Sequence, residues 1–217
     1  MLRPRIIPCL LISNGGLVKT VQFKNPKYVG DPINTVKIFN EKKADELIVL
    51  DIDATKKSIK PNLNLIKKLA AECRMPLCYG GGITTVKEAE LLVDIGVEKV
   101  AISSSVIENP LLLKKLVSAV GSQSVVVVID ILEQKNFLTK KHLIRTKNGT
   151  KTHNDELFSL IKKIQDLGVG EIVLNSIDRD GMMQGYDFEL VDKIKPLINV
   201  PLTILGGAGS LEDIKKL

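Results

Sequence analysis

Two stretches of this chain repeat one pattern, Met75-Pro76-Leu77-Cys78-Tyr79-Gly80-Gly81-Gly82-Ile83 and Val200-Pro201-Leu202-Thr203-Ile204-Leu205-Gly206-Gly207-Ala208-Gly209. Each combines a short apolar strand with a glycine-rich turn and a polar helix start, at Thr84-Thr85 in the first copy and at Ser210 in the second. Such a turn directs backbone N–H groups and a helix N-terminus towards an anion. A tight turn without a ligand is the alternative for either copy alone. Because the copies lie 125 residues apart, we predict a duplicated half-barrel that holds a ligand with two phosphates.

Short apolar runs alternate with amphipathic helical patterns along the whole chain. The predicted strands are residues 6–12, 46–51, 77–79, 99–103, 125–130, 171–175 and 202–205, and helices are predicted near residues 36–43, 63–73, 86–95 and 110–120. Runs rich in Val, Ile and Leu that are separated by helices are typical of parallel strands buried on both faces. Seven strand–helix units favour an α/β fold, a (β/α)8 TIM barrel of two half-barrel repeats, over an open doubly wound sheet. We expect residues 1–217 to form one domain of this kind.

The two halves differ in length and in their connections. In the first half the glycine repeat is followed by a fourth strand and helix, whereas the second half reaches Leu217 inside its seventh helix. We therefore expect the barrel to be truncated before the eighth strand and helix, with a barrel of seven units by design as the alternative. Residues 14–23 are expected to form a long lid-like loop, and residues 133–154 a small polar hairpin.

The composition indicates a globular protein without a membrane segment. Hydrophobic residues make up 44% of the chain and charged residues 26%, and the apolar runs are too short to span a bilayer. The start of the chain lacks the long apolar segment of a signal peptide, so we expect a cytoplasmic location. The three cysteines show no zinc-site spacing and are interpreted as reduced thiols. His142 and His153 lie in a polar stretch without a ligand cluster, so we expect neither a metal nor a cofactor.

The net charge of +6 arises from 31 basic and 25 acidic residues. A nucleic-acid surface would combine a basic stripe with stacking aromatic side chains. Here the lysines are scattered, only 4% of the residues are aromatic and tryptophan is absent, so nucleic acid is not an expected partner. A solvated basic surface is the simplest explanation of the charge, and a phosphorylated small-molecule substrate also suits it.

In a barrel of this type, catalytic side chains lie at the carboxyl ends of the strands. The residues expected there are Leu11, Asp51, Asp53, Gly81, Gly82, Ser103, Ser104, Asp130, Asp178, Asp180, Gly206 and Gly207. Carboxylates beside two phosphate loops suit acid–base chemistry on a sugar phosphate, although many such aspartates are helix caps or turn residues. Asp130 is the strongest candidate because it ends an apolar run. Lys19, in the long first loop, is a weaker one because a loop lysine is usually only solvated.

Charged residues occupy the opposite ends of the strands. Arg5, Glu46, Lys99 and Glu171 lie at or just before the starts of the first, second, fourth and sixth strands. On a closed barrel they would alternate in sign around the bottom mouth. Residues on this face usually serve stability. The functional alternative is a gate in the barrel floor.

A set of motifs that covers the whole chain resembles one known family. The motifs are Arg5-Ile6-Ile7-Pro8-Cys9-Leu10, Val18-Lys19, Gly30-Asp31-Pro32, Asp45-Glu46-Leu47, Gly80-Gly81-Gly82-Ile83, Gly121-Ser122-Gln123, Ile129-Asp130, Gly170-Glu171-Ile172, Ser176-Ile177-Asp178-Arg179-Asp180-Gly181, Gly185-Tyr186-Asp187 and Gly206-Gly207-Ala208-Gly209. Together they are similar to the cyclase subunit, a lyase, of imidazole glycerol phosphate synthase in histidine biosynthesis. The resemblance implies a (βα)8 barrel that forms a heterodimer with a glutaminase subunit and conducts its ammonia from the bottom face.

The resemblance also implies roles for individual residues. Asp130 and Lys19 match a catalytic carboxylate and the loop lysine of the family. The family's gate residues are matched by Arg5, Glu46, Lys99 and Glu171, and its phosphate-binding residues by Gly82, Ser103, Ser104, Asp180, Gly181 and Gly207. Because the family also binds phosphate through its eighth strand, one of the two phosphate sites is expected to be incomplete here.

Two positions depart from the pattern of the cyclases. Leu11 stands where they carry an aspartate, so general acid–base help of roughly 10²–10⁴-fold is lost there. Ser103 stands where they usually carry asparagine. Leu11, Cys78-Tyr79 and residues 24–29 look closer to a branch of paralogues that accompany a glutaminase and a sugar amidotransferase, and that are linked to acetamidino modification of surface-polysaccharide sugars.

The sequence therefore leaves three possible functions, and it does not decide whether the chain is itself an enzyme. The leading hypothesis is an ammonia-handling barrel subunit for sugar amidation, in which loss of a cyclisation carboxylate is tolerable. The second is the cyclase of histidine biosynthesis, which the retained Asp130, Lys19 and phosphate loops favour. The third is a non-catalytic scaffold that binds the glutaminase and activates it.

Overall fold

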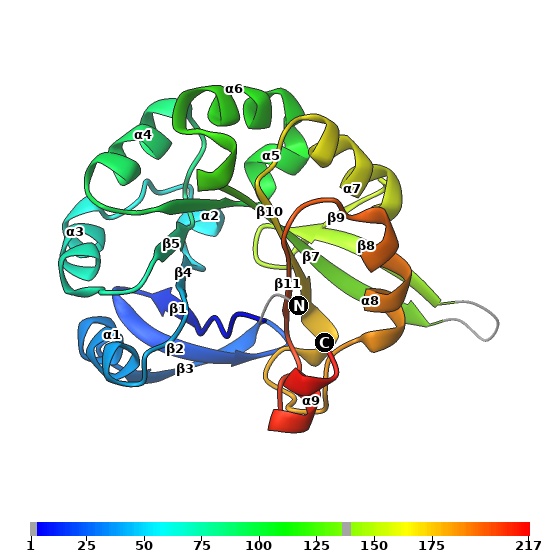
Figure 1. The fold of residues 1–217 in the computed structure, drawn as a ribbon, viewed down its shortest axis with the longest axis horizontal. Helices are drawn as coiled ribbons and strands as arrows, with labels where there is room; N and C mark the ends of the chain where they lie inside the picture. The colour runs from blue at the N-terminus through cyan, green and yellow to red at the C-terminus, as the bar shows by residue number, and fades with distance from the viewer. Residues whose placement is uncertain (1–3, 136–139) are drawn as a thin grey trace.

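A computed structural model describes residues 4–135 and 140–217, and a curled parallel sheet forms its centre (Figure 1). Its parallel strands, in the order in which they pair, are β1 (Cys9–Ser13), β4 (Leu47–Asp51), β5 (Leu77–Gly80), β6 (Lys99–Ile102), β7 (Val125–Lys135), β10 (Glu171–Ser176) and β11 (Leu202–Leu205). This arrangement confirms the predicted α/β fold of the TIM-barrel type. Within the described residues no pairing joins β11 to β1, so the curl is open between these two strands.

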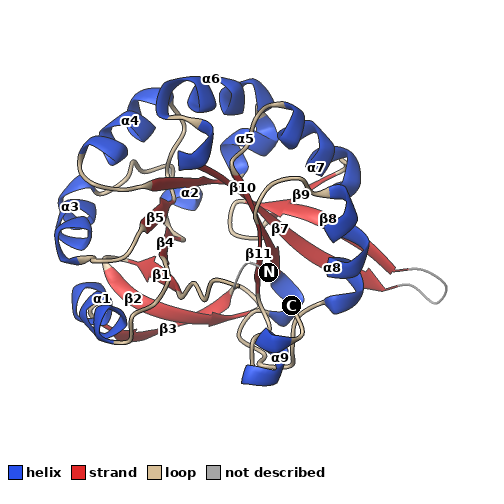
Figure 2. Cartoon of the chain, in the orientation of Figure 1, coloured by secondary structure: helices blue, strands red, loops and turns tan. Residues whose placement is uncertain are grey.

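Helices form an outer layer around the curled sheet (Figure 2). They are α1 (Pro32–Glu41), α3 (Leu63–Glu72), α4 (Val86–Asp94), α6 (Pro110–Val120), α7 (Leu157–Asp166) and α8 (Phe188–Ile194). The short helices α2 (Ala54–Lys57) and α5 (Ser104–Glu108) lie inside this layer, and α9 (Leu211–Lys215) follows β11. Alternate strand residues face the two sides of the sheet. In β7, Val127 and Ile129 belong to the large core shared with the helices, whereas Val126 and Val128 belong to a second apolar cluster inside the curl. The short helices α2 and α5 were not predicted.

The two glycine-rich stretches have the same local structure, as the repeat predicts. Thr85 begins α4 with a capping box to Glu88, and Ser210 begins α9 with a capping box to Asp213, so the two boxes lie 125 residues apart. In each box the carboxylate accepts hydrogen bonds from backbone N–H groups at the helix start. These N–H groups are therefore not available to a bound anion, contrary to the expectation for the two helix starts.

The segment after the first strand is a hairpin rather than the expected lid-like loop. Strands β2 (Gly16–Val21) and β3 (Lys24–Gly30) extend the sheet antiparallel beyond β1 and reach towards α9 (Figure 1). Thr20 Oγ1 donates a hydrogen bond of 2.8 Å to Asp180 Oδ2, and Gln22 N donates one of 2.9 Å to the Asp180 carbonyl. These bonds dock the hairpin on the turn that follows β10.

A second hairpin leaves the barrel after β7. Strand β8 (Lys140–Thr146) pairs with β7 and with β9 (Lys151–His153), which confirms the hairpin predicted within residues 133–154; residues 136–139 lie outside the described part. The first strand begins at Cys9 rather than at the predicted Ile6. Pro8 has no amide hydrogen, so it cannot continue the ladder as a donor, although its carbonyl still accepts from Ile48 N. Among the described helices none is long and apolar enough to cross a membrane.

Candidate functional site

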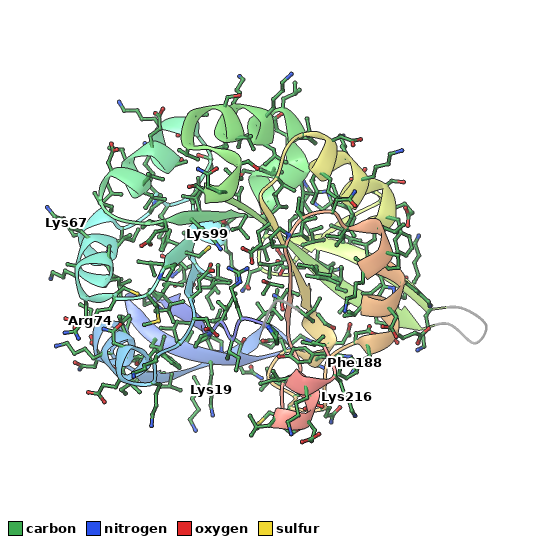
Figure 3. The ribbon with its side chains drawn as sticks, viewed as in Figure 1. Lys19, Lys67, Arg74, Lys99, Phe188 and Lys216 are labelled. Carbon is green, nitrogen blue, oxygen red and sulfur yellow. The ribbon has the colours of Figure 1, made fainter. Side chains whose placement is uncertain are left out.

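Four charged side chains meet at the lower end of the barrel interior, and we call Arg5, Glu46, Lys99 and Glu171 the floor ring. Lys99 Nζ lies 2.8 Å from both Glu46 Oε2 and Glu171 Oε2. Arg5 Nη1 lies 2.6 Å from Glu46 Oε2, and Arg5 Nη2 lies 3.2 Å from Glu171 Oε1. Figure 3 shows Lys99 inside the curl of strands. The four side chains thus come together in the alternating ring that the sequence predicts, although Arg5 lies four residues before β1.

The carboxylates of the floor ring are more buried than its cations. The side chains of Glu46 and Glu171 are 3% and 4% exposed, against 17% for Lys99 and 40% for Arg5. Burial alone would lower the pKa of Lys99, but its hydrogen bonds to Glu171 and Glu46 outweigh burial and raise that pKa. Burial likewise opposes ionisation of Glu171, but hydrogen bonds from Lys99 and Thr203 lower its pKa overall. Lys99 and Glu171 therefore stay charged at neutral pH.

An apolar layer lies above the floor ring inside the barrel. It is a buried cluster of Ile48, Cys78, Ala101, Val126, Val128 and Val173. Burial raises the pKa of the Cys78 thiol well above its usual range, and the nearby charges of Glu46 and Glu171 raise it further. Cys78 is therefore a neutral thiol, and this layer carries no charge.

A cavity of about 530 Å³ opens at the carboxyl ends of the strands. Residues in its wall include Cys9, Leu11, Asp51, Gly82, Ser103, Ser104, Asp130, Asn175 and Asp180. The structure therefore brings Asp130 together with four of the predicted phosphate-binding positions. We call this cavity the upper pocket.

Asp130 is the one strongly perturbed carboxyl group in the described wall of the upper pocket. Burial raises its pKa, a hydrogen bond from Asn175 lowers it, and the charge of Asp180 raises it, with a net value of about 7. Asn175 Nδ2 donates that bond to Asp130 Oδ1 over 2.8 Å. A carboxyl group with a pKa near neutrality can both accept and return a proton at physiological pH, which suits a general acid or base.

Substitution of Asp130 by asparagine is expected to raise stability at neutral pH. Because the carboxyl pKa is about 7 in the folded chain and near 4 in an unfolded one, stability falls as pH rises between these values. The isosteric variant escapes this loss, so above pH 7 its free energy of unfolding should exceed that of the wild type by roughly 2–4 kcal/mol. Thermal melts from pH 4 to 8 measure the difference.

Glu189→Gln supplies a control of opposite sign. Hydrogen bonds from Lys140 and Lys193 lower the pKa of Glu189 from its usual 4.5 to about 2, so its contribution to stability is lost only as pH falls through this interval. The stability difference between Glu189→Gln and the wild type should therefore stay constant from about pH 5 to 8, where the difference for Asp130→Asn grows. If the Asp130→Asn and wild-type melting curves run parallel from pH 4 to 8, the carboxyl group does not carry the raised pKa.

Other aspartates at the strand ends have structural roles. Asp51 Oδ1 accepts hydrogen bonds of 3.0 Å from the backbone N–H groups of Asp53 and Ala54. Asp53 Oδ2 in turn accepts from Ser13 Oγ and from Lys57 Nζ. These are the turn and cap roles that the sequence left open for such residues.

Known proteins resemble this chain over its described length and beyond the residues of the site. A family model described as histidine biosynthesis protein matches residues 5–217. The chain belongs to that family. A relative from Leptospira borgpetersenii, provisionally named imidazole glycerol phosphate synthase subunit HisF, is 54% identical over 217 residues, which are all of this chain and 85% of the relative.

Two further relatives have the same kind of name. The Vibrio vulnificus protein provisionally named imidazole glycerol phosphate synthase subunit hisF3 is 55% identical over all of this chain and 83% of its own length. The imidazole glycerol phosphate synthase subunit HisF of Flavobacterium psychrophilum is 41% identical over 98% of this chain and 83% of its own length. The family resemblance deduced from the motifs is thereby confirmed.

The six positions that match phosphate-binding residues of the family divide into two groups. Gly82, Ser103, Ser104 and Asp180 line the upper pocket, whereas Gly181 and Gly207 are not among its described lining residues. Ser103 Oγ is buried without a hydrogen-bond partner in the described part of the chain. Ser104 Oγ accepts from Lys147 N at 3.0 Å, so its own hydroxyl hydrogen is available to a ligand.

Lys19, which matches the loop lysine of the family, does not lie with Asp130. It is exposed on β2 opposite Lys27 of β3, and it is not among the described residues that line the upper pocket. Figure 3 shows Lys19 at the outer edge of the molecule. Side chains alternate along a strand, and Thr20 takes the inward direction to Asp180, so Lys19 points outward. The structure therefore does not support its prediction as a catalytic residue.

His142 has neighbours that the sequence analysis did not foresee. Glu133 of β7, His142 of β8 and Asp187 at the start of α8 bring potential ligand atoms within 4.8 Å of one another. Asp187 Oδ2 lies 3.5 Å from His142 Nε2, and Asp187 Oδ1 accepts from Leu190 N as the helix cap. The expectation that no ligand-type cluster surrounds His142 is wrong, because pairing of β7 with β8 places His142 directly opposite Glu133.

Asn175 is the pocket residue that the sequence analysis missed. It ends the apolar run of β10 as Asp130 ends the run of β7, and the two residues are partners in the ladder. A polar residue at the end of a buried strand was therefore the available signal. It was overlooked because an amide does not titrate.

Proposed function

We propose that this chain is the barrel subunit of an ammonia-transferring complex, which receives ammonia from a glutaminase subunit and supports amidation of a sugar for a surface polysaccharide. The observation that carries the proposal is the floor ring, which leads through the apolar layer to the upper pocket. A cytoplasmic location is part of the proposal, because free cysteines suit that compartment.

The chemistry of the interior favours ammonia as the molecule conducted. Moving an ion into an apolar layer costs far more than moving a small neutral molecule. The charges of the floor ring are paired with one another, so none is left unpaired to bind an ion. The same side chains can still form hydrogen bonds with ammonia. Neutral ammonia can therefore pass from the ring into the layer of Ile48, Ala101 and Val173 at low cost.

A phosphorylated ligand is proposed for the upper pocket. Gly82, Ser103, Ser104 and Asp130 all line it. Two hydroxyl groups with free hydrogen-bonding capacity are suited to phosphate oxygens. A phosphorylated sugar would thus lie next to the carboxyl group that can exchange a proton.

Leu11 distinguishes sugar amidation from the cyclase reaction of histidine biosynthesis. Its side chain, in the middle of β1, lines the upper pocket and cannot transfer a proton. With ammonia and the bisphosphorylated cyclase substrate we expect turnover far below the roughly 10 per second that is usual for enzymes. Steady-state assays of the purified chain measure this rate.

Leu11→Asp is the matched variant for that assay. If the missing carboxylate limits the cyclase reaction, this variant should turn over at least about tenfold faster than the wild type, within the range of general acid–base catalysis. Ordinary enzyme turnover by the wild-type chain would overturn the prediction and favour the lyase alternative.

Transfer of labelled nitrogen tests the proposed function directly. Glutamine labelled with ¹⁵N in its amide is supplied to the chain together with the glutaminase and the sugar amidotransferase of the same organism. Label in an amidated sugar supports the proposal, whereas label in an imidazole product supports the cyclase. Label only in free ammonia, with faster glutamine hydrolysis when this chain is present, supports the scaffold alternative.

A further inference from the structure

Asn175 is tied to Asp130 by position and by a hydrogen bond. The two residues face each other across the ladder between β10 and β7, and Asn175 Nδ2 donates to Asp130 Oδ1 over 2.8 Å. Asn175 is only 4% exposed, so its side chain has little freedom to turn away. One half of its amide group therefore orients Asp130.

The other half of the amide group is unused. Asn175 Oδ1 is buried and has no hydrogen-bond partner in the described part of the chain, yet the residue lines the upper pocket. Buried acceptors are nearly always paired in native proteins, so an open one calls for an explanation. A ligand with an N–H or O–H donor would supply the missing partner.

The position of Asn175 along the barrel indicates which donor reaches it. Glu171, Val173 and Asn175 alternate along one face of β10, from the floor ring through the apolar layer to the upper pocket. At a rise of about 3.3 Å per residue, Asn175 lies roughly 13 Å along β10 from Glu171. A molecule that leaves the ring and crosses the apolar layer meets Asn175 and Asp130 as it enters the pocket.

We propose that Asn175 Oδ1 and the Asp130 carboxylate form an ammonia-binding subsite at the entrance of the upper pocket. This inference rests on the proposed function, since it names where the conducted ammonia is held. Ammonia has three N–H donors and one lone pair. Two adjacent acceptors bind two of its hydrogens and leave the lone pair free for a carbon electrophile in the pocket.

The subsite can be tested with ammonia alone on the purified chain. Ammonium chloride is titrated at alkaline pH, where more of it is neutral ammonia, while NMR follows the Asp130 carboxyl carbon and the Asn175 side-chain nitrogen. We expect saturable shifts for the wild type. Potassium chloride at the same concentrations controls for ionic strength, and equal shifts with both salts would overturn the proposal.

Asn175→Leu removes both hydrogen-bonding groups while keeping the number and branching of the side-chain heavy atoms. The apparent dissociation constant for ammonia, followed at the Asp130 carboxyl carbon, should rise at least about tenfold. Ser176→Ala, which changes the neighbouring residue on the opposite side of β10, should leave it unchanged. If Asn175→Leu binds ammonia as the wild type does, the assignment of Asn175 is wrong.

The pKa of Asp130 provides a second readout in the same samples. Burial raises the pKa of Asp130, the hydrogen bond from Asn175 lowers it, and the charge of Asp180 raises it. The thiol of Cys9 in β1 is also nearby, and burial raises its pKa, with a contribution from the charge of Asp130. Loss of the bond in Asn175→Leu should move the carboxyl titration upward from its value in the wild type. Asn175→Thr, which keeps one acceptor oxygen, shows whether the fold tolerates change here and should bind ammonia with intermediate affinity.

The inference and the proposed function fail separately. If ammonia titrates the Asp130 signal but no product acquires labelled nitrogen from glutamine, the ammonia subsite stands and the proposed function is wrong. If label reaches the sugar but Asn175→Leu neither weakens ammonia binding nor raises the ammonia concentration needed for half-maximal rate, the subsite is wrong and the function stands.

Discussion

Replacement of Lys99 by alanine is expected to lower the free energy of unfolding by about 3–5 kcal/mol, because it removes the cation that two buried carboxylates share. Lys99 Nζ lies 2.8 Å from both Glu46 Oε2 and Glu171 Oε2. Arg5 contacts the same carboxylates, but its side chain is 40% exposed against 17% for Lys99, so solvent screens its charge more strongly. Chemical denaturation of the purified variant measures the loss.

Lys193→Ala is the matched control for this substitution. Lys193 Nζ also lies 2.8 Å from a carboxylate oxygen, that of Glu189, but both side chains are more than half exposed. Solvent screens this pair, so its removal should change stability far less than removal of Lys99 does. Equal losses for the two variants would contradict the argument from burial.

Lys99→Ala also tests whether the floor ring is a gate. In the complex with the glutaminase, a ring that lacks Lys99 should let ammonia escape, so that glutamine hydrolysis exceeds product formation. Lys99→Met, which keeps the length of the side chain without its charge, separates loss of charge from loss of bulk. If hydrolysis and product formation stay matched while stability falls, the ring is structural and the conduit proposal loses its main support.

The parallel strands could be predicted from the sequence because each is a continuous apolar run. The runs at 125–129 and 171–175 are buried on both faces of the sheet, which is the environment that their composition indicates. The hairpin of β2 and β3 could not be predicted in the same way. Nearly every residue of β3 is exposed, so this strand has no buried face and no apolar alternation to reveal it.

The site was predictable where topology alone decides a residue's position. Asp130 and the floor ring lie at the ends of parallel strands, and all such strands place equivalent ends on the same side of the sheet. Lys19 was not predictable, because its direction depends on a strand register that a shift of one residue would reverse. At the helix starts of Thr85 and Ser210, Glu88 and Asp213 accept hydrogen bonds from the N-cap backbone N–H groups, so those donors are already paired within the chain.

Gly181→Ala is expected to lower the free energy of unfolding by about 2–5 kcal/mol. Gly181 has φ of +70°, a left-handed conformation that costs other residues about 1–2 kcal/mol. A Cβ atom at this position would also lie 2.3 Å from the carbonyl oxygen of Thr20 and 3.1 Å from Val21 Cα, and relieving such overpacking costs about 1–3 kcal/mol more. The backbone of β2 would have to move away from the turn after β10. Chemical denaturation measures the total.

Gly15→Ala separates the two costs, because Gly15 has φ of +77° but no heavy atom within 4 Å of the Cβ position among the described residues. This substitution should lower the free energy of unfolding only by the conformational term of about 1–2 kcal/mol. Hydrogen exchange at Gln22 N, which donates to the Asp180 carbonyl, reports whether the hairpin stays docked. That amide should lose protection in Gly181→Ala and keep it in Gly15→Ala. Because Thr20 and Phe23 of the same hairpin line the upper pocket, undocking should also weaken binding of a phosphorylated ligand. Equal stability losses with Gln22 still protected would mean that close approach of β2 is not what requires glycine at this turn.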